Sequence, residues 1–356
     1  MTLNANIREE QKAVVVCENL VKIYKVAELE VVALQGLDLT INYGEMLGIV
    51  GSSGSGKSTL LNILGGLDRP SAGRVTVDGM DLLKLTEASL TTYQRDKIGF
   101  VWQQTGRNLI PYLTAQENIE LPMTMAGKWT TAEKHGWSEE LLEAIGLYDR
   151  RHHRLTQLSG GQQQRIAIAV ALANRPTILL GDEPTGEVDT ATAQTIMDTF
   201  RKLREQYGLT IIIVTHDPRI AGQVDRVVAI RDGKTSTETI RQVGQLEDEM
   251  VGEQVAEEEA IANLEHITYQ EYVVLDSAGR LQVPREWLED LGIGKRAQLE
   301  LSDGAVIIRP AEGHAEGEVK RLTLEDQLDL LFTDQQPPAP RKPGGLLGRL
   351  RLRRRN

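Results

Sequence analysis

The first stretch whose residue types point to chemistry is a glycine-rich loop with the pattern G-x-x-x-x-G-K-[ST] at residues 51–59. It follows the apolar run Met46–Val50 and leads into Leu60–Leu64, the strand–loop–helix context that this pattern requires. Glycines allow backbone N–H groups to curl around a phosphate chain, and the helix N-terminus adds its positive dipole. A plain turn would not need the lysine and hydroxyl at this spacing, so the loop predicts a nucleoside triphosphate site. The residues predicted to bind the phosphates are Gly51, Ser52, Ser53, Gly54, Ser55, Gly56, Lys57, Ser58 and Thr59.

Two carboxylates end a second apolar run, Thr177–Leu180, at Asp182 and Glu183. Asp182 is placed to act near Mg²⁺ together with the Ser58 hydroxyl, since hard cations prefer oxygen ligands. Glu183 is placed beside an attacking water, which a carboxylate can orient and deprotonate. The predicted chemistry is therefore hydrolysis of a terminal phosphate, with ATP and Mg²⁺ as the cofactors.

A second anion-binding surface is predicted at residues 158–165, where Ser159, Gly160 and Gly161 precede the helical run Ile166–Ala173. A serine hydroxyl, free N–H groups and the helix dipole together suit an anion. Taken alone, the same residues fit an ordinary N-terminal cap, because serine is a favoured capping residue.

The elements that must position these groups are strands alternating with helices, which gives an α/β class. At 356 residues the chain has room for one large domain and a small one. Its one cysteine, Cys17, excludes an internal disulfide, the N-terminus lacks a signal-peptide pattern, and no apolar run approaches the roughly 18–20 residues that span a bilayer. A net charge of -11 argues against nucleic acid as the main ligand.

The order of these segments resembles the ATPase subunit of an ABC transporter. The glycine-rich loop is Walker A, residues 158–165 are the signature, 178–183 are Walker B, and Thr215-His216-Asp217 follows another apolar strand. The resemblance covers roughly residues 13–240, and the signature is what separates this family from generic P-loop ATPases. It implies a P-loop NTPase core with an inserted helical subdomain at about 105–175.

The resemblance also implies further site residues. Tyr24 matches the aromatic that stacks on adenine, and Gln103 matches the glutamine that touches Mg²⁺ and the attacking water. Asp189 matches the loop that crosses the dimer interface, and His216 matches the switch histidine at the γ-phosphate. With Glu183, Gln103 and His216 form the implied catalytic set. Ser58, Gln103 and Asp182 form the metal set, and Ser159, Gly160, Gly161 and Gln162 contact nucleotide.

The family mechanism implies a head-to-tail homodimer in which each ATP lies between Walker A of one copy and the signature of the other. Residues 108–123 and 182–186 resemble the macrolide-export and lipoprotein-release branch, in which the ATPase drives a separate membrane permease. Two departures are Gln104–Arg107, which is longer and more polar than usual, and Glu187-Val188 in place of Asn-Leu. The implied location is cytoplasmic, on the inner face of the membrane.

Beyond the predicted ATPase domain, 13–242, the chain continues with an acidic linker over 243–268. Residues 244–265 hold eight acidic residues and no lysine or arginine. Residues 269–311 resemble the AbrB-type swapped-hairpin module: hairpins at 272–283 and 297–309 flank a short helix that ends at Gly292. Such a short module needs a second copy to bury a core, which predicts dimerisation. Its five basic and six acidic residues between 272 and 310 give a net charge of −1, which argues against DNA binding.

The last segment, 312–356, is rich in proline and arginine and is predicted to be an extended tail. Its leucines and arginines suit peripheral contact with anionic lipid or an acidic permease surface, and a solvated tail is the alternative. Two other functions stay open: a soluble ABC ATPase of DNA repair or translation, and a nucleotide-switched DNA-binding regulator that uses the AbrB-like module. The sequence does not name the permease or its substrate.

Overall fold

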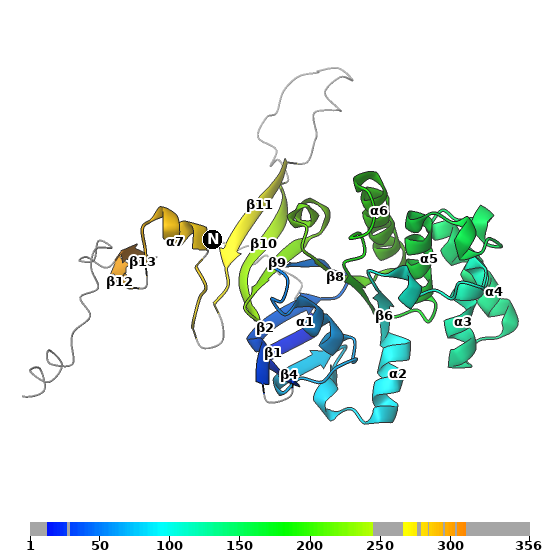
Figure 1. The fold of residues 1–356 in the computed structure, drawn as a ribbon, viewed down its shortest axis with the longest axis horizontal. Helices are drawn as coiled ribbons and strands as arrows, with labels where there is room; N and C mark the ends of the chain where they lie inside the picture. Colours follow the sequence, from blue (N-terminus) through cyan, green and yellow to red (C-terminus); the bar gives the residue numbers. More distant parts are fainter. Residues whose placement is uncertain are drawn as a thin grey trace, which may run out of the picture. The chain divides into compact units, whose positions relative to one another are not determined.

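The structure is a computed structural model that describes residues 13–26, 29–244, 266–275, 279–283, 285–294, 296–302 and 305–310. Most of the predicted acidic linker, the predicted turn residues 276–278 and 303–304, and the whole predicted tail lie outside these ranges. The chain divides into two compact units, residues 1–285 and 286–356. Figure 1 labels the elements along the chain.

The centre of the first unit is a seven-stranded sheet in the order β11-β10-β9-β3-β8-β7-β6. Five of its strands run parallel: β3 (Met46–Val50), β6 (Ile98–Val101), β7 (Ile178–Asp182), β8 (Thr210–Thr215) and β9 (Arg226–Arg231). These strands are short apolar runs because both of their faces are buried. The parallel centre matches the predicted α/β class.

Successive residues of the central strands alternate between two apolar cores, as the strand period of two requires. In β8, Ile211 and Ile213 belong to the core that packs against the helices, whereas Ile212 and Val214 belong to the core beside α1 and the second sheet. All four are almost completely buried. The sheet is therefore packed on both faces, and this packing fixes the positions of the loops that follow the carboxyl ends of its strands.

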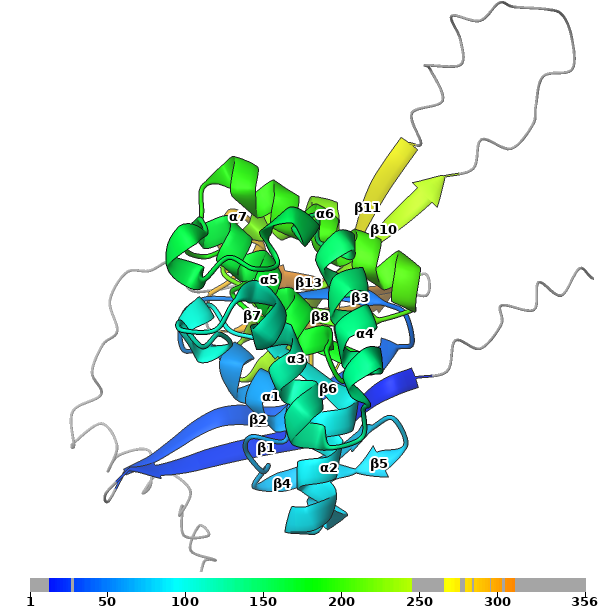
Figure 2. The same ribbon diagram turned by 90° about the vertical axis from the view of Figure 1, so that its right-hand side faces the viewer.

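The second sheet has four antiparallel strands in the order β2-β1-β4-β5. They are β1 (Ala13–Val26), β2 (Leu29–Asn42), β4 (Ala72–Val77) and β5 (Met80–Asp81). The long β1–β2 pair extends away from the helices (Figure 2). Its buried side chains close the core over α1 (Lys57–Leu64).

The remaining helices gather mainly at the opposite end of the first unit (Figure 1). Three of them, α3 (Ala115–Ala126), α4 (Thr131–Ala144) and α5 (Gly160–Leu172), occupy the predicted helical insertion. α3, α4 and α5 each begin with a Ser or Thr capping box, in which the cap and the third residue bond each other's backbone N–H. The first unit also contains α2 (Glu87–Lys97) and α6 (Thr190–Tyr207). Short 3₁₀ turns lie at Leu82–Lys84, Thr105–Arg107, Tyr148–Arg150, Leu155–Gln157 and Pro218–Gln223.

The end of the predicted ATPase domain continues into a further strand pair. β9 is followed by β10 (Lys234–Gly244), and β11 (His266–Val273) pairs antiparallel with β10 from Thr237↔Val273 to Gly244↔His266. Both ends of the predicted 243–268 linker therefore lie in strands, and the start of the segment predicted to be an AbrB-like module extends the seven-stranded sheet. The physical reason is that β10 presents an edge of unpaired backbone groups, which a following β-rich segment can satisfy.

The C-terminal part keeps some of the predicted elements. Of the hairpin predicted at 272–283, the described residues show the bridge Leu275↔Leu281, and Tyr272 and Val273 belong to β11. The helix α7 (Arg285–Asp290) is followed by Gly292 with φ 63°, as expected for a glycine that ends a helix. β12 (Ala297–Ser302) and β13 (Ala305–Pro310) form the second hairpin, in the predicted place.

Candidate nucleotide-binding and hydrolysis site

The glycine-rich loop leaves β3 and enters α1 at Lys57, with no side chain capping the first turn of the helix. The N–H groups of that turn are therefore free to face an anion. Gly56 has φ 105°, and a Cβ there would lie 2.6 Å from the Ala33 carbonyl oxygen on β2. Only glycine fits this position, because the backbone is left-handed and packed against a neighbouring strand. The Ser55 hydroxyl is buried without a partner among the described residues, as suits a phosphate-binding loop.

A cavity of about 330 Å³ opens above the loop. Lys57 enters it with Nζ donating hydrogen bonds to the carbonyl oxygens of Gly51 at 2.8 Å and Ser52 at 2.9 Å. Burial lowers the pKa of Lys57, and the nearby Glu183 and Asp182 carboxylates oppose this shift. A partly desolvated cation held along the loop suits the charge of a phosphate chain. The cavity is lined by Ala33, Ser53, Gly54, Gly56, Lys57, Ser58, Thr59, Glu183 and His216.

The predicted metal pair is close together: Ser58 Oγ donates to Asp182 Oδ1 over 3.2 Å. Asp182 ends β7, and burial raises its pKa despite the hydrogen bond from Ser58. A hydroxyl and a desolvated carboxylate are oxygen ligands of the kind that Mg²⁺ uses, with phosphates and waters completing its shell. These residues fit the expected ion.

Glu183 and His216 form the centre of the predicted catalytic set. His216 Nδ1 and Glu183 Oε2 are 2.9 Å apart, and both residues line the cavity. Glu183 has φ 48°, which is strained for a residue with a side chain, and its N–H donates to the Val214 carbonyl oxygen over 2.8 Å. This hydrogen bond to β8 thus holds the Glu183 backbone in a conformation that it would rarely adopt alone, and so fixes where the carboxylate lies.

Gln103 reaches the same place from β6. A Cβ on Gly186 would lie 3.1 Å from Gln103 Nε2 and 3.4 Å from Glu183 Oε2. The amide and the carboxylate therefore flank one glycine, and the predicted grouping of Gln103 with Glu183 agrees with this geometry.

Tyr24 is anchored by a residue that the sequence analysis did not single out. Its hydroxyl donates to Asp68 Oδ2 over 2.7 Å, and Lys22 Nζ lies 4.7 Å from the ring centroid and 2.5 Å from Asp68 Oδ1. Asp68 follows α1 and is 44 residues away in sequence, so no local pattern could have revealed the contact. One face of the Tyr24 ring is occupied by a cation and the phenol is fixed in orientation.

The signature residues do not join this cavity. Ser159 caps α5: its hydroxyl accepts from the Gln162 N–H over 3.3 Å, and Gln162 Oε1 accepts from the Ser159 N–H over 2.9 Å. Ser159 and Gly160 are exposed, and beyond its chain neighbours and its own helix backbone, no described atom lies within 4 Å of where a Gly160 Cβ would be. The capping interpretation is therefore confirmed, whereas anion binding at this exposed helix N-terminus stays a prediction.

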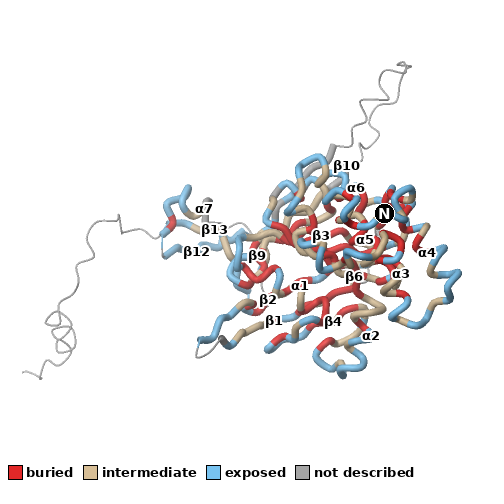
Figure 3. Tube along the Cα trace, turned by 45° about the vertical axis from the view of Figure 1, so that its right-hand side comes forward, coloured by how far each residue is buried: buried red, intermediate tan, exposed pale blue. Residues whose placement is uncertain are grey.

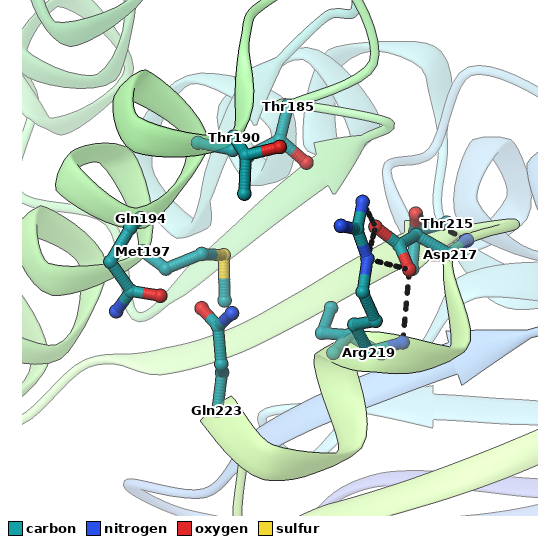
Figure 4. A pocket seen from close by; sticks show the side chains of 10 residues that line it. Thr185, Thr190, Gln194, Met197, Thr215, Asp217, Arg219 and Gln223 are labelled. Carbon is teal, nitrogen blue, oxygen red and sulfur yellow. Dashed lines mark hydrogen bonds and ion pairs between the residues drawn. The ribbon is translucent and has the colours of Figure 1, made fainter.

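Asp189 is likewise exposed and caps α6 by accepting from the Thr192 N–H over 3.0 Å. Hydrogen bonds from Thr192 hold its pKa below the usual range. A further cavity of about 250 Å³ lies beside this helix, between α6 and the loop after His216 (Figure 4). Met197 and Gln223 face each other there, and Asp217 binds the Arg219 guanidinium.

A parallel α/β sheet with a glycine-rich loop, a hydrogen-bonded Ser58–Asp182 pair and a Glu183–His216 pair is the arrangement of a P-loop nucleoside triphosphatase. The comparisons with known proteins agree. The ABC transporter family model matches residues 34–186. An uncharacterized ABC transporter ATP-binding protein of Thermotoga maritima is 50% identical over 213 residues, which cover 60% of this chain and 89% of the relative. The chain belongs to the ABC transporter ATP-binding proteins, and it is an ATP-hydrolysing enzyme.

Other relatives bear on the fold and on the branch. The dimeric post-hydrolysis structure of the ATP-binding cassette MJ0796 with ADP and Pi is 44% identical, with a TM-score of 0.57, and the match covers 63% of this chain and 97% of that one. The macrolide export ATP-binding/permease protein MacB 2 of Aeromonas hydrophila is 46% identical over 218 residues, 61% of this chain but 33% of the relative. Within the described residues, no helix is both long and apolar enough to cross a bilayer.

Proposed function

We propose that two copies of this chain pair head to tail, bind two Mg-ATP between them, and use hydrolysis to drive a separate membrane permease. The observation that carries the proposal is the division of the site. The loop, Glu183 and His216 line one cavity, whereas Ser159 and Gly160 are exposed on another helix and are not part of its lining. An exposed, glycine-flanked helix N-terminus has the chemistry to complete a phosphate site on a second copy.

The proposed roles combine the family resemblance with the geometry of the site. Lys57 and the open first turn of α1 bind the phosphates, while Ser58 and Asp182 hold Mg²⁺, which neutralises charge on the β- and γ-phosphates when bound. Glu183 orients the attacking water and accepts its proton, and Gln103 helps to place that water. His216, within hydrogen-bond distance of Glu183, contacts the γ-phosphate. Tyr24 packs against adenine, and Asp189 meets the partner copy.

The permease is of the macrolide-export or lipoprotein-release type. Relatives named MacB support this branch, because each is an ATP-binding/permease protein of which this chain matches about a third. On this proposal the permease is an integral-membrane partner, and the ATPase acts from its cytoplasmic face.

The C-terminal unit adds a second, nucleotide-independent contact between the two copies. Four large apolar side chains of this unit are about half exposed or more: Trp287 (47%), Leu299 (68%), Leu301 (80%) and Val306 (64%). Among the described residues of the unit, the large apolar side chain that is buried is Ile293. A unit this small cannot enclose a core alone, and a second copy would present the same apolar side chains. This supports the swapped-hairpin dimer, with its first strand, β11, already paired to the ATPase sheet.

Co-purification from membranes tests the proposal directly. The full chain carrying Glu183→Gln should hold ATP, trap the closed dimer and retain an integral-membrane partner that mass spectrometry can identify. Lys57→Ala, which weakens nucleotide binding, is the matched control and should retain less of that partner. Recovery of DNA instead of a membrane protein would favour the regulator alternative.

A further inference from the structure

Thr192, in the first turn of α6, contacts two segments of the proposed dimer interface with different atoms. Its hydroxyl donates to Asp189 Oδ2 over 2.7 Å. Its methyl lies against the signature: a Cβ on Gly161 would be only 2.2 Å from Thr192 Cγ2. Asp189 and Gly161 are 28 positions apart on different elements, and Thr192 touches both.

One torsion angle controls both contacts. The hydroxyl and methyl of threonine are attached to the same Cβ, so rotation about χ1 moves them together between staggered positions. While the hydroxyl is bonded to Asp189, the methyl is fixed against Gly161. Any movement that takes Asp189 away also frees the methyl to leave the signature turn.

This arrangement is more than the helix cap requires. A capping aspartate needs only the backbone N–H two or three residues later, which Thr192 already supplies over 3.0 Å. The hydroxyl bond and the contact with α5 are additional. They join the start of α6 to the start of α5, the two helix ends that carry Asp189 and Ser159.

We propose that Thr192 is a positioning residue that couples the Asp189 loop to the signature. This inference rests on the proposed composite site and goes beyond it, because it names the side chain that holds the two partner-facing segments in one arrangement. The two segments then meet the partner's nucleotide and the partner's loops as one unit. Thr192 itself does not touch ATP.

Two substitutions separate the hydroxyl from the methyl in the full chain. Thr192→Val keeps a methyl for Gly161 and removes the donor to Asp189, so kcat should fall by roughly tenfold, the scale of a lost hydrogen bond to a charged group. Thr192→Ser keeps the donor and removes the methyl, and its kcat should fall less. Nucleotide affinity of the monomer should stay within about twofold, because Walker A is untouched.

Thr195→Val is the matched control. Thr195 lies one turn further along α6, is exposed, and donates its hydroxyl to the Ala191 carbonyl oxygen of the same helix. Its loss should leave kcat unchanged. An unchanged kcat for Thr192→Val would overturn the proposal.

A double-mutant cycle tests the contact with the signature. Gly161→Ala places a methyl where Thr192 Cγ2 lies, and its kcat should fall by at least about tenfold because Thr192 can move aside only by releasing Asp189. In the Thr192→Ser background that atom is gone, so Gly161→Ala should cost several-fold less. Equal losses in both backgrounds would overturn the coupling. Should Thr192→Val prove unfolded in a thermal melt, this cycle decides alone.

Glu183→Gln separates failure of this inference from failure of the proposed function. If Glu183→Gln turns over like the unmodified chain, the catalytic assignment itself is wrong. If Glu183→Gln is inactive and the Gly161–Thr192 cycle is additive, the catalytic assignment stands and only the coupling by Thr192 is refuted.

Discussion

The ATPase core and the C-terminal unit differ in where their large apolar side chains lie. In the core, residues such as Leu47, Ile49 and Ile212 are fully buried, whereas α7, β12 and β13 are mostly exposed (Figure 3). The core is therefore stabilised by its own packing, and the proposed head-to-tail pairing serves chemistry alone. In the C-terminal unit the proposed second copy would bury the exposed apolar surface. If both proposals hold, the chain meets its partner in two ways, of which one depends on ATP.

The largest expected effect comes from removing the proposed general base, which stops hydrolysis and leaves the ATP-dependent contact in place. Glu183→Gln should lower turnover by roughly 10²- to 10⁴-fold, the usual contribution of a general base, while ATP still binds and a closed dimer accumulates. Lys57→Ala should instead lose nucleotide affinity, because Lys57 acts on the phosphates. Steady-state hydrolysis and nucleotide titration separate the two, and near-normal turnover for Glu183→Gln would contradict the assignment.

Ser159→Arg tests the half of the site that the partner supplies. A bulky cation at the exposed start of α5 should reduce hydrolysis by roughly 10²-fold or more, as does removal of other preorganised charge-stabilising groups. ATP affinity of a monomeric preparation should not change, since Ser159 does not line the chain's own cavity. A large loss of affinity in the monomer would show that Ser159 serves its own nucleotide.

Removing the C-terminal unit tests the proposed contact between copies that does not depend on ATP. The predicted domain boundary near residue 242 lies inside β10, which pairs with β11, so a cut there would split this strand pair. The shortened chain should therefore end after Val283, which keeps β11 paired. The shortened chain should be monomeric at micromolar concentration until ATP is added, and its activity per chain should rise steeply with protein concentration. Light scattering measures both states. A tether of this kind supplies an effective concentration in roughly the mM range.

A point substitution makes the same test without deletion. Leu301→Asp on β12 should abolish the nucleotide-free dimer because it places a charge in the buried contact. Gln298→Asp is the matched control, because residues three apart in a strand lie on opposite faces. If light scattering finds the full chain monomeric without nucleotide, the C-terminal unit has another role.

The smallest effect concerns stability rather than turnover. Burial raises the pKa of Asp182 above its ordinary value of 3.8, so its ionised form is less stable in the folded than in the unfolded chain. The resulting loss of folding stability is absent well below pH 3.8, grows as the pH rises from 3.8 through the folded pKa, and is complete at neutral pH. Asp182→Asn should therefore raise the melting temperature of the nucleotide-free protein by about 1–3 °C at pH 7 and abolish hydrolysis. A lower melting temperature would mean that the carboxylate stabilises the free fold.

Most of the core could be predicted from the sequence because its signals are local. The glycine-rich loop, the carboxylates ending β7 and the capped signature each lie within a few residues of a strand or helix boundary. Gln103 and His216 came from the family resemblance, and the structure brings both to Glu183. The hairpin β12–β13 was also predicted, since its turn interrupts two apolar runs.

The rest depends on contacts that are distant in the sequence. The β-rich segment 266–273 suits any strand partner, and nothing in its own residues selects β10 over a second copy of the module. Asp68 reaches Tyr24, and Thr192 reaches Gly161, only because separate elements pack together. These contacts follow from the three-dimensional arrangement of the sheet and helices.

Cys17 has a practical consequence. It is the one cysteine in the chain, it lies on β1 inside the apolar core, and burial raises its pKa to about 12. Such a thiol is almost entirely protonated at neutral pH and out of reach of alkylating reagents. A cysteine introduced at an exposed site can therefore be labelled selectively in an otherwise native sequence. One spectroscopic probe on each copy would then report the distance between the two chains as nucleotide binds and is hydrolysed.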